Sequence, residues 1–166
     1  MPQTPFEGAL SPNALHSLSG LEIVRGMRDG RLPVPPLVLQ FGFRPAEVEA
    51  GRVVFSATPD ARHYNPLGTV HGGYIATLLD TAMGCAVHSK LAAGHAYTTL
   101  EFKVNFTRAI TTATGEVRAE GKLLHLSRNI ATAEARLCDE SERLLAHATT
   151  TCLIFSAARP RTAPPA

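Results

Sequence analysis

The sequence predicts an α+β fold in which an antiparallel sheet wraps around one long, buried helix. The stretch 65–87 begins as a loop and continues as an apolar helix in which Asp80 is the only charged residue. A helix with no charged face needs cover nearly all round. Two strand-like segments precede this helix and four follow it, joined by short turns, which favour antiparallel pairing. One helix covers such a sheet incompletely, so we also expect a partner subunit.

The segment before the first strand is expected to be a flexible N-terminus followed by a helical extension. Residues 1–16 are rich in proline, glycine and serine, a composition typical of loosely held chain ends. Ser17 or Ser19 is suited to be the N-cap of a short amphipathic helix that ends before the following prolines. A brief helical turn over 37–40 completes an extension that spans residues 17–40.

The strands are predicted from alternating apolar and polar residues and from the turns between them. They are expected at 41–49, 52–58, 98–107, 115–124, 129–138 and 143–155. The first two form a hairpin that turns at Ala50-Gly51. In the third strand, Leu100, Phe102, Val104 and Phe106 are expected on one face and Thr99, Glu101, Lys103 and Asn105 on the other. One domain over 41–156 and a disordered tail over 157–166 follow from this pattern.

Composition excludes several classes of function. The 166 residues suit one domain, and 45% hydrophobic with 18% charged residues is typical of a soluble globular protein. A net charge of +2 is too small to indicate nucleic-acid binding. The sequence contains no apolar run of membrane-spanning length and no signal-peptide pattern at its start. The three cysteines are odd in number and lie in apolar contexts, so we expect buried free thiols and a cytoplasmic location.

One motif carries a family resemblance. Residues 65–73 read N-P-L-G-T-V-H-G-G, Asp80 follows His71 by nine positions, and T-T-L-E-F-K-V-N-F occupies 98–106. This pattern and the strand order resemble the hotdog-fold acyl-CoA thioesterases of the phenylacetate-degradation (PaaI-like) branch, over about residues 41–155. The resemblance implies a hotdog fold, hydrolysis of an acyl-CoA to free acid and coenzyme A, and homodimers or tetramers made of two dimers. Coenzyme A is then part of the substrate, and no separate cofactor is expected.

The resemblance also assigns roles to particular residues. Asn65 and the Gly72 backbone N–H would hold the thioester carbonyl, with His71 supporting that end of the site. Asp80, from the facing subunit, would act as general base or nucleophile. A hydroxyl residue at the start of the following strand corresponds to Thr99.

Two assignments are less specific. Thr98 is an alternative to Thr99 as the hydroxyl residue. The coenzyme A phosphates need cations, and the candidates near strand ends and turns are Arg108, Lys122 and Arg128, each of which also suits an ordinary solvated surface.

The chemistry of the motif is consistent with these roles. The first N–H groups of a helix lack intrahelical partners and lie at its positive end, and Gly72 and Gly73 leave that backbone open to a carbonyl. A shielded carboxylate at Asp80 can take a proton from water or attack directly. The eight residues from Gly72 to Asp80 span about 12 Å of helix. One straight helix cannot bring both groups to one carbonyl, so we expect a composite site shared by two antiparallel helices about a two-fold axis.

Simpler interpretations stay open for each residue. Asn65 also suits a turn before proline, His71 can be only an orienting hydrogen-bond partner, and the glycines can form a tight helix entry. A hotdog dehydratase or hydratase and a non-catalytic acyl-CoA-binding module are alternative functions. The histidines show no metal-binding spacing, so no metal is expected. The sequence does not identify the acyl group.

Overall fold

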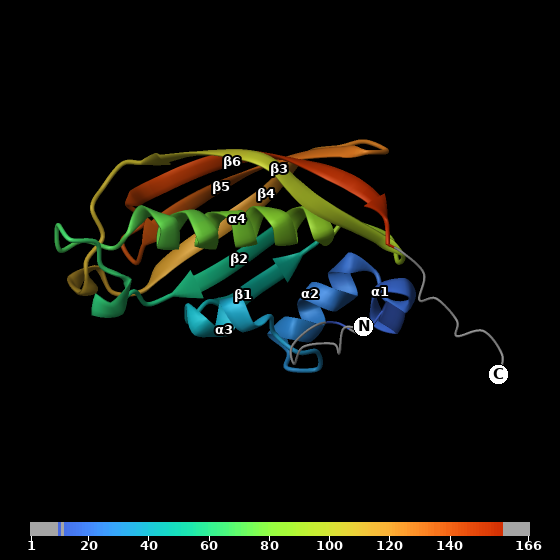
Figure 1. Cartoon of the computed structure of the whole chain (residues 1–166), viewed down its shortest axis with the longest axis horizontal. Helices are drawn as coiled ribbons and strands as arrows, with labels where there is room; N and C mark the ends of the chain where they lie inside the picture. Colours follow the sequence, from blue (N-terminus) through green and yellow to red (C-terminus); the bar gives the residue numbers. More distant parts are fainter. Residues whose placement is uncertain (1–9, 11, 158–166) are drawn as a thin grey trace, which may run out of the picture.

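A computed structural model of the chain describes residue 10 and residues 12–157, which form one six-stranded antiparallel sheet around a central helix (Figure 1). The strand order is β1-β2-β4-β5-β6-β3, so that β1 and β3 are the edges. The strands are β1 Arg44–Glu49, β2 Arg52–Ala57, β3 His95–Phe106, β4 Val117–Leu126, β5 Ile130–Asp139 and β6 Leu144–Ser156. The predicted fold class and strand number are therefore confirmed.

Four helices within the described part of the chain accompany the sheet. They are α1 Pro12–Ser17, α2 Gly20–Arg28, α3 Pro36–Gln40 and α4 Gly72–His88, with short 3-10 turns at Ala61–His63 and Thr112–Thr114. The sheet curls around α4, and α2 and α3 lie beside β1 (Figure 1). No helix among the described residues is long and apolar enough to cross a membrane.

One face of α4 forms the centre of the core. Leu78, Leu79, Ala82 and Met83 have no exposed surface. Helix and sheet approach so closely that a Cβ added at Gly121 in β4 would lie 2.3 Å from the Ala82 carbonyl oxygen. Glycine at this position is therefore required by packing and not by its backbone angles.

The opposite face of α4 is less covered than expected. Ala76, Thr77, Asp80 and Thr81 remain partly exposed in the single chain. These small or lightly polar side chains are not typical of a fully solvated helix face, which is usually rich in lysine and glutamate. The described residues therefore leave this face of α4 partly open.

The N-terminal region contains one helix, α1, that the sequence did not predict. Residues 12–16 are part of helix α1, and Leu15 accepts a backbone hydrogen bond from Gly94 at 2.8 Å. How loosely residues 1–16 are held stays a prediction, and 1–9 and 11 lie outside the described residues. Ser19 is the N-cap of α2, in a capping box with Glu22. Of the expected disordered tail, Ala157 donates a backbone hydrogen bond to Gly94, and 158–166 are outside the described part.

The first strand begins at Arg44, three residues later than expected. The residues expected to start it pack instead against an aromatic side chain of α4. Phe41 and Phe43 contact Tyr74 with ring centroids 5.7 Å and 5.1 Å apart, and Tyr74 Oη donates to the Phe41 carbonyl at 3.1 Å. These contacts join the end of α3 to the first turn of α4. The expected hairpin at Ala50-Gly51 is present, with Gly51 in the left-handed region at φ 85°.

The alternation predicted for the third strand is wrong at Thr99, because β3 contains a β-bulge there. Thr99 pairs with Cys152 and Phe102 pairs with Thr150, with a register shift between Thr99 and Glu101. Because Cys152 and Thr150 share one face of β6, Thr99 and Phe102 also share a face. Thr99 was expected opposite Phe102. The extra residue, Leu100, instead turns the Thr99 side chain towards α4.

Candidate active site

Asp80 lies in the middle of α4, where its side chain meets β3. Thr99 Oγ1 donates a hydrogen bond to Asp80 Oδ1 at 3.0 Å. Burial raises the pKa of the Asp80 carboxyl, and the hydrogen bond from Thr99 opposes that rise by lowering the pKa. A carboxyl poised in this way is suited to accept a proton at a pH above the usual range for aspartate.

The surroundings of Asp80 are mostly apolar. It lines a cavity of about 280 Å³ between α4 and the N-terminal extension. The other lining residues are Val24, Met27, Val34, Pro35, Leu37, Val38, Pro45, Phe55, Thr81, Cys85, His88 and Tyr97. A concave apolar site with one perturbed carboxylate is a typical arrangement for small-molecule binding.

His71 is the N-cap of α4, and its side chain accepts a hydrogen bond from the Gly73 backbone N–H, with 2.8 Å between Gly73 N and His71 Nδ1. With Nδ1 as the acceptor, a neutral ring carries its proton on Nε2. Both glycine amides were expected to be open, but the Gly73 N–H is engaged by this bond. Gly72 N has no hydrogen-bond partner among the described residues, so Gly72 supplies the open donor.

Asn65 shapes the loop before α4. Its Oδ1 accepts from the backbone N–H groups of Leu67 and Thr69 at 2.9 Å and 3.3 Å, and its Nδ2 donates to Thr69 Oγ1 at 2.9 Å. The simpler interpretation, a turn former, therefore describes its contacts within the chain. The second hydrogen on Nδ2 is left for another acceptor.

Asn65 and Gly72 line a second cavity of about 320 Å³, together with Phe106 and Arg108. Arg108 Nη1 donates to the Leu144 carbonyl at 2.9 Å, which holds the guanidinium at the edge of this cavity. Asp80 is not among the residues that line it, and Gly72 does not line the cavity of Asp80. A single chain thus keeps the two halves of the expected site apart.

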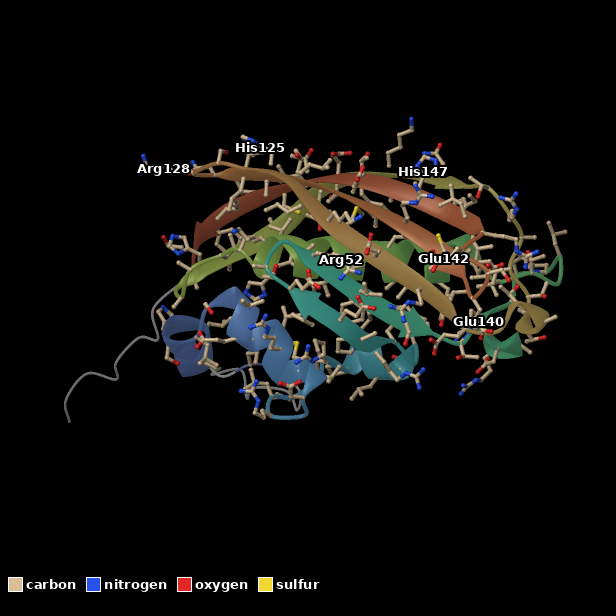
Figure 2. The ribbon with its side chains drawn as sticks, turned by 180° about the vertical axis from the view of Figure 1, so that it is seen from behind. Arg52, His125, Arg128, Glu140, Glu142 and His147 are labelled. Atoms are coloured by element: carbon tan, nitrogen blue, oxygen red, sulfur yellow. The ribbon has the colours of Figure 1, made fainter. Side chains whose placement is uncertain are left out.

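Two of the expected phosphate-binding residues lie elsewhere. Lys122 is on the outer face of the sheet, where its Nζ pairs with Glu120 Oε1 at 2.6 Å. Arg128 is at the β4–β5 turn, at the opposite end of that face from Glu140 and Glu142 (Figure 2). Neither residue lines the cavity of Asp80 or that of Gly72, and their roles stay predictions.

The structure adds residues that sequence reasoning missed. His88 and Tyr97 line the cavity of Asp80, and burial lowers the pKa of His88 and raises that of Tyr97. The helical spacing of His88 from Asp80 was the available signal, because positions eight apart lie close to one face. The extension residues gave no such signal. No group of three or more histidine, cysteine, aspartate or glutamate side chains within the described ranges is arranged to hold a metal ion.

Comparisons with known proteins identify the class. The model of the Thioesterase superfamily matches residues 67–146. The proofreading thioesterase EntH of Klebsiella pneumoniae is 30% identical over 107 residues, which cover 64% of this chain and 77% of that protein. The chain belongs to the Thioesterase superfamily and is a thioester hydrolase.

Solved structures place it within that class. A phenylacetic acid degradation-related protein from Ralstonia eutropha is 27% identical, with a TM-score of 0.72 over 78% of this chain and 98% of that one. A thioesterase family protein from Silicibacter pomeroyi is 25% identical, with a TM-score of 0.73 over 84% and 100%. The PaaI protein of Escherichia coli shares the fold, with a TM-score of 0.72 over 83% and 94% at 17% identity. The fold is that of the hotdog thioesterases of PaaI type.

Proposed function

We propose that the protein hydrolyses an acyl-CoA thioester to the free acid and coenzyme A in a site shared by two subunits. Asp80 of one subunit acts as general base or nucleophile, and the Gly72 N–H of the other polarises the carbonyl. The observation that carries the proposal is the separation of Asp80 and Gly72 into two cavities of one chain. One cavity contains the carboxylate of Asp80, and the other contains the N–H donor of Gly72.

The edge strand β3 relates the two halves geometrically. Thr99 contacts Asp80, and further along β3 the Phe106 ring lies against Gly72, 3.1 Å from where a Cβ would be. Two β3 strands can pair in antiparallel fashion about a two-fold axis near Phe102 and Lys103. Thr99 of one strand then lies close to Phe106 of the other. The Gly72 end of one α4 then approaches Asp80 of the other.

This dimer would also cover surfaces that a single chain leaves open. β3 is an edge of the sheet, and exposed edges invite pairing with another strand. Leu100, Phe102 and Phe106 on this strand are 55%, 38% and 51% exposed. The partly exposed face of α4 lies next to the same edge, since Asp80 on that face contacts Thr99.

The residues have distinct tasks in the proposed reaction. Ionised Asp80 attacks the thioester carbonyl carbon, or removes a proton from a water that does so. The Thr99 hydroxyl positions that carboxylate. The Gly72 N–H, at the positive end of α4, stabilises the negative charge that develops on the carbonyl oxygen. The carbon–sulfur bond then breaks, and the coenzyme A thiolate leaves. With a water nucleophile the free acid forms directly, whereas attack by Asp80 leaves an acyl anhydride that a water molecule then cleaves to the acid and the Asp80 carboxylate.

Mixed dimers test the shared site. Asp80→Asn removes the carboxylate, and Gly72→Pro removes the N–H at the first position of a helix, where proline is tolerated. Each variant alone should be inactive on acyl-CoA. Heterodimers of the two keep one intact site, so about half of the wild-type activity should return.

The matched control is Gly72→Ala, because its Cβ meets Phe106 as the proline Cβ does but its N–H is retained. Activity in Gly72→Ala with none in Gly72→Pro assigns the effect to the lost donor. Heterodimers without activity would show that the site is not shared. One turnover in ¹⁸O-labelled water tests the role of Asp80: an acid product without ¹⁸O, together with ¹⁸O in the Asp80 carboxylate, requires a nucleophilic Asp80, because a general base puts one ¹⁸O into the acid.

A further inference from the structure

We propose that the N-terminal extension forms one wall of the acyl pocket and that this pocket selects uncharged acyl groups of medium length, such as octanoyl. The inference rests on the proposed function, because it takes Asp80 as the reacting group. The extension means α2, α3 and the segment between them, residues 20–40. It lies outside the part of the chain that matches the family, residues 67–146.

The cavity beside Asp80 has two walls of different origin. Val24, Met27, Val34, Leu37 and Val38 belong to the extension. On the other side α4 contributes Asp80, Thr81, Cys85 and His88, and β3 contributes Tyr97. Almost half of the residues that line the cavity therefore come from the extension.

The extension is anchored at both ends of this cavity. At one end α2 abuts the end of α4, so closely that a Cβ at Gly20 would lie 1.7 Å from the His88 carbonyl oxygen, and Gly20 N donates to the Leu91 carbonyl at 3.0 Å. At the other end, Phe41 packs on Tyr74. Close packing is the rule in protein interiors. A void between two tight contacts, beside a carboxylate, is better explained as a ligand site than as loose packing.

The cavity limits the length of its occupant. From Asp80 to His88 the axis of α4 rises about 12 Å. A volume of about 280 Å³ is near the lower end of the range for ligand pockets, about 300–1,000 Å³. The length and the small volume both suit an acyl chain of about eight carbons with its carbonyl near Asp80.

The polarity of the cavity favours an uncharged chain. Burial lowers the pKa of His88, which keeps the ring neutral at physiological pH, and raises the pKa of the Cys85 thiol to about 12. The far end of the cavity therefore has no charge to pair with a terminal carboxylate or ammonium group. Such a group would lose its hydration there without compensation.

Substitutions in the extension test this proposal. The kcat/KM for acyl-CoAs from acetyl to palmitoyl is measured for the wild-type protein, Val34→Phe and Met27→Ala. We expect the wild-type profile to peak near octanoyl. Val34→Phe should lower the octanoyl value about tenfold relative to the acetyl value, since each excluded methylene group is worth roughly a factor of four. Met27→Ala should move the peak to longer chains.

A matched pair of leucines on α3 provides the control. Leu37 lines the cavity, whereas Leu39 is 66% exposed and does not. Leu37→Ala should change the chain-length profile, and Leu39→Ala should leave it as in the wild type. Melting temperatures identify any variant that fails to fold. The cavity variants that do fold then show whether the cavity sets the preferred acyl-chain length. Identical profiles in all folded variants would overturn the proposal.

A binding measurement separates this inference from the proposed reaction. Calorimetry with S-ethyl- and S-octyl-coenzyme A, which contain no thioester bond, reports on the pocket without turnover. A larger loss of binding for the octyl compound than for the ethyl compound in Val34→Phe supports the pocket even if Asp80→Asn still hydrolyses acyl-CoA. Equal octyl binding in wild type and Val34→Phe refutes the pocket even if Asp80→Asn is inactive.

Discussion

Thr99 on the edge strand β3 donates a hydrogen bond to Asp80 on the central helix, with 3.0 Å between Thr99 Oγ1 and Asp80 Oδ1. The bulge at Leu100 makes this contact possible, because regular alternation would place Thr99 on the outer face of the sheet. The bond opposes the effect of burial on the pKa of Asp80. One local irregularity in a strand thus sets both the orientation and the acidity of the proposed catalytic carboxylate.

Replacing Thr99 should change the pH dependence of hydrolysis. The hydrogen bond lowers the pKa of Asp80, so Thr99→Val should raise that pKa. The acidic limb of kcat/KM, which reports the free enzyme, should then move to higher pH. Thr99→Ser keeps the hydroxyl and should return the limb towards its original position. A limb at the same pH in Thr99→Val would show that Thr99 does not act through Asp80.

Asp80→Asn should abolish activity and stabilise the fold. The kcat should fall by a factor of about 10² to 10⁴, the usual contribution of a general base. Because burial raises the pKa of Asp80 above 3.8 in the folded chain, the folded state holds this proton more tightly than the unfolded state. Ionisation therefore opposes folding as pH rises from 3.8 through the raised pKa.

Melting temperatures measured between pH 3.8 and pH 7 show whether ionised Asp80 destabilises the folded state. Asp80→Asn should melt above the wild type at pH 7, and the difference should shrink towards zero as the pH falls to 3.8. Glu101→Gln is a suitable control, since Glu101 is an exposed acid on β3. A destabilised Asp80→Asn at pH 7 would mean that the ionised carboxylate has stabilising partners.

The proposed two-fold axis predicts a cross-link. Lys103 is exposed on β3 and lies within one residue of the axis. Two cysteines at this position should approach to within about 7 Å between Cα atoms, the limit for a disulfide. Lys103→Cys should form a covalent dimer under mild oxidation, seen as a doubled mass on a non-reducing gel, whereas Lys103→Ser should not. A monomeric oxidised Lys103→Cys would exclude this pairing of β3.

Arg108 and Lys122 should differ in their effect on substrate binding. Arg108 borders the cavity of Gly72, and Lys122 lies on the outer face of the sheet. A hydrogen bond to a charged group contributes about 1.5 to 3 kcal/mol, so Arg108→Ala should raise the KM for acyl-CoA by about tenfold or more, with kcat little changed. Lys122→Ala should leave KM near the wild-type value. Equal effects of the two substitutions on KM would argue against Arg108 as a phosphate-binding residue.

The sequence by itself determined the fold class, because apolar periodicity and turn residues act locally. The helical stripe of Ile75, Leu78 and Met83 and the turn at Gly51 needed no knowledge of distant residues. The motif from Asn65 to Asp80 also identified the family. The length of helix between Gly72 and Asp80 was enough to predict that a single chain separates them.

Only the tertiary structure decided which partners each site residue has. The bulge that turns Thr99 towards Asp80 depends on how β3 pairs with β6, and alternation along one strand cannot reveal it. The capture of the Gly73 N–H by His71 is likewise a matter of side-chain geometry. The cavity between Asp80 and the extension arises where segments more than forty residues apart along the chain meet. Contacts between distant segments depend on packing in three dimensions, which periodicity along the chain does not encode.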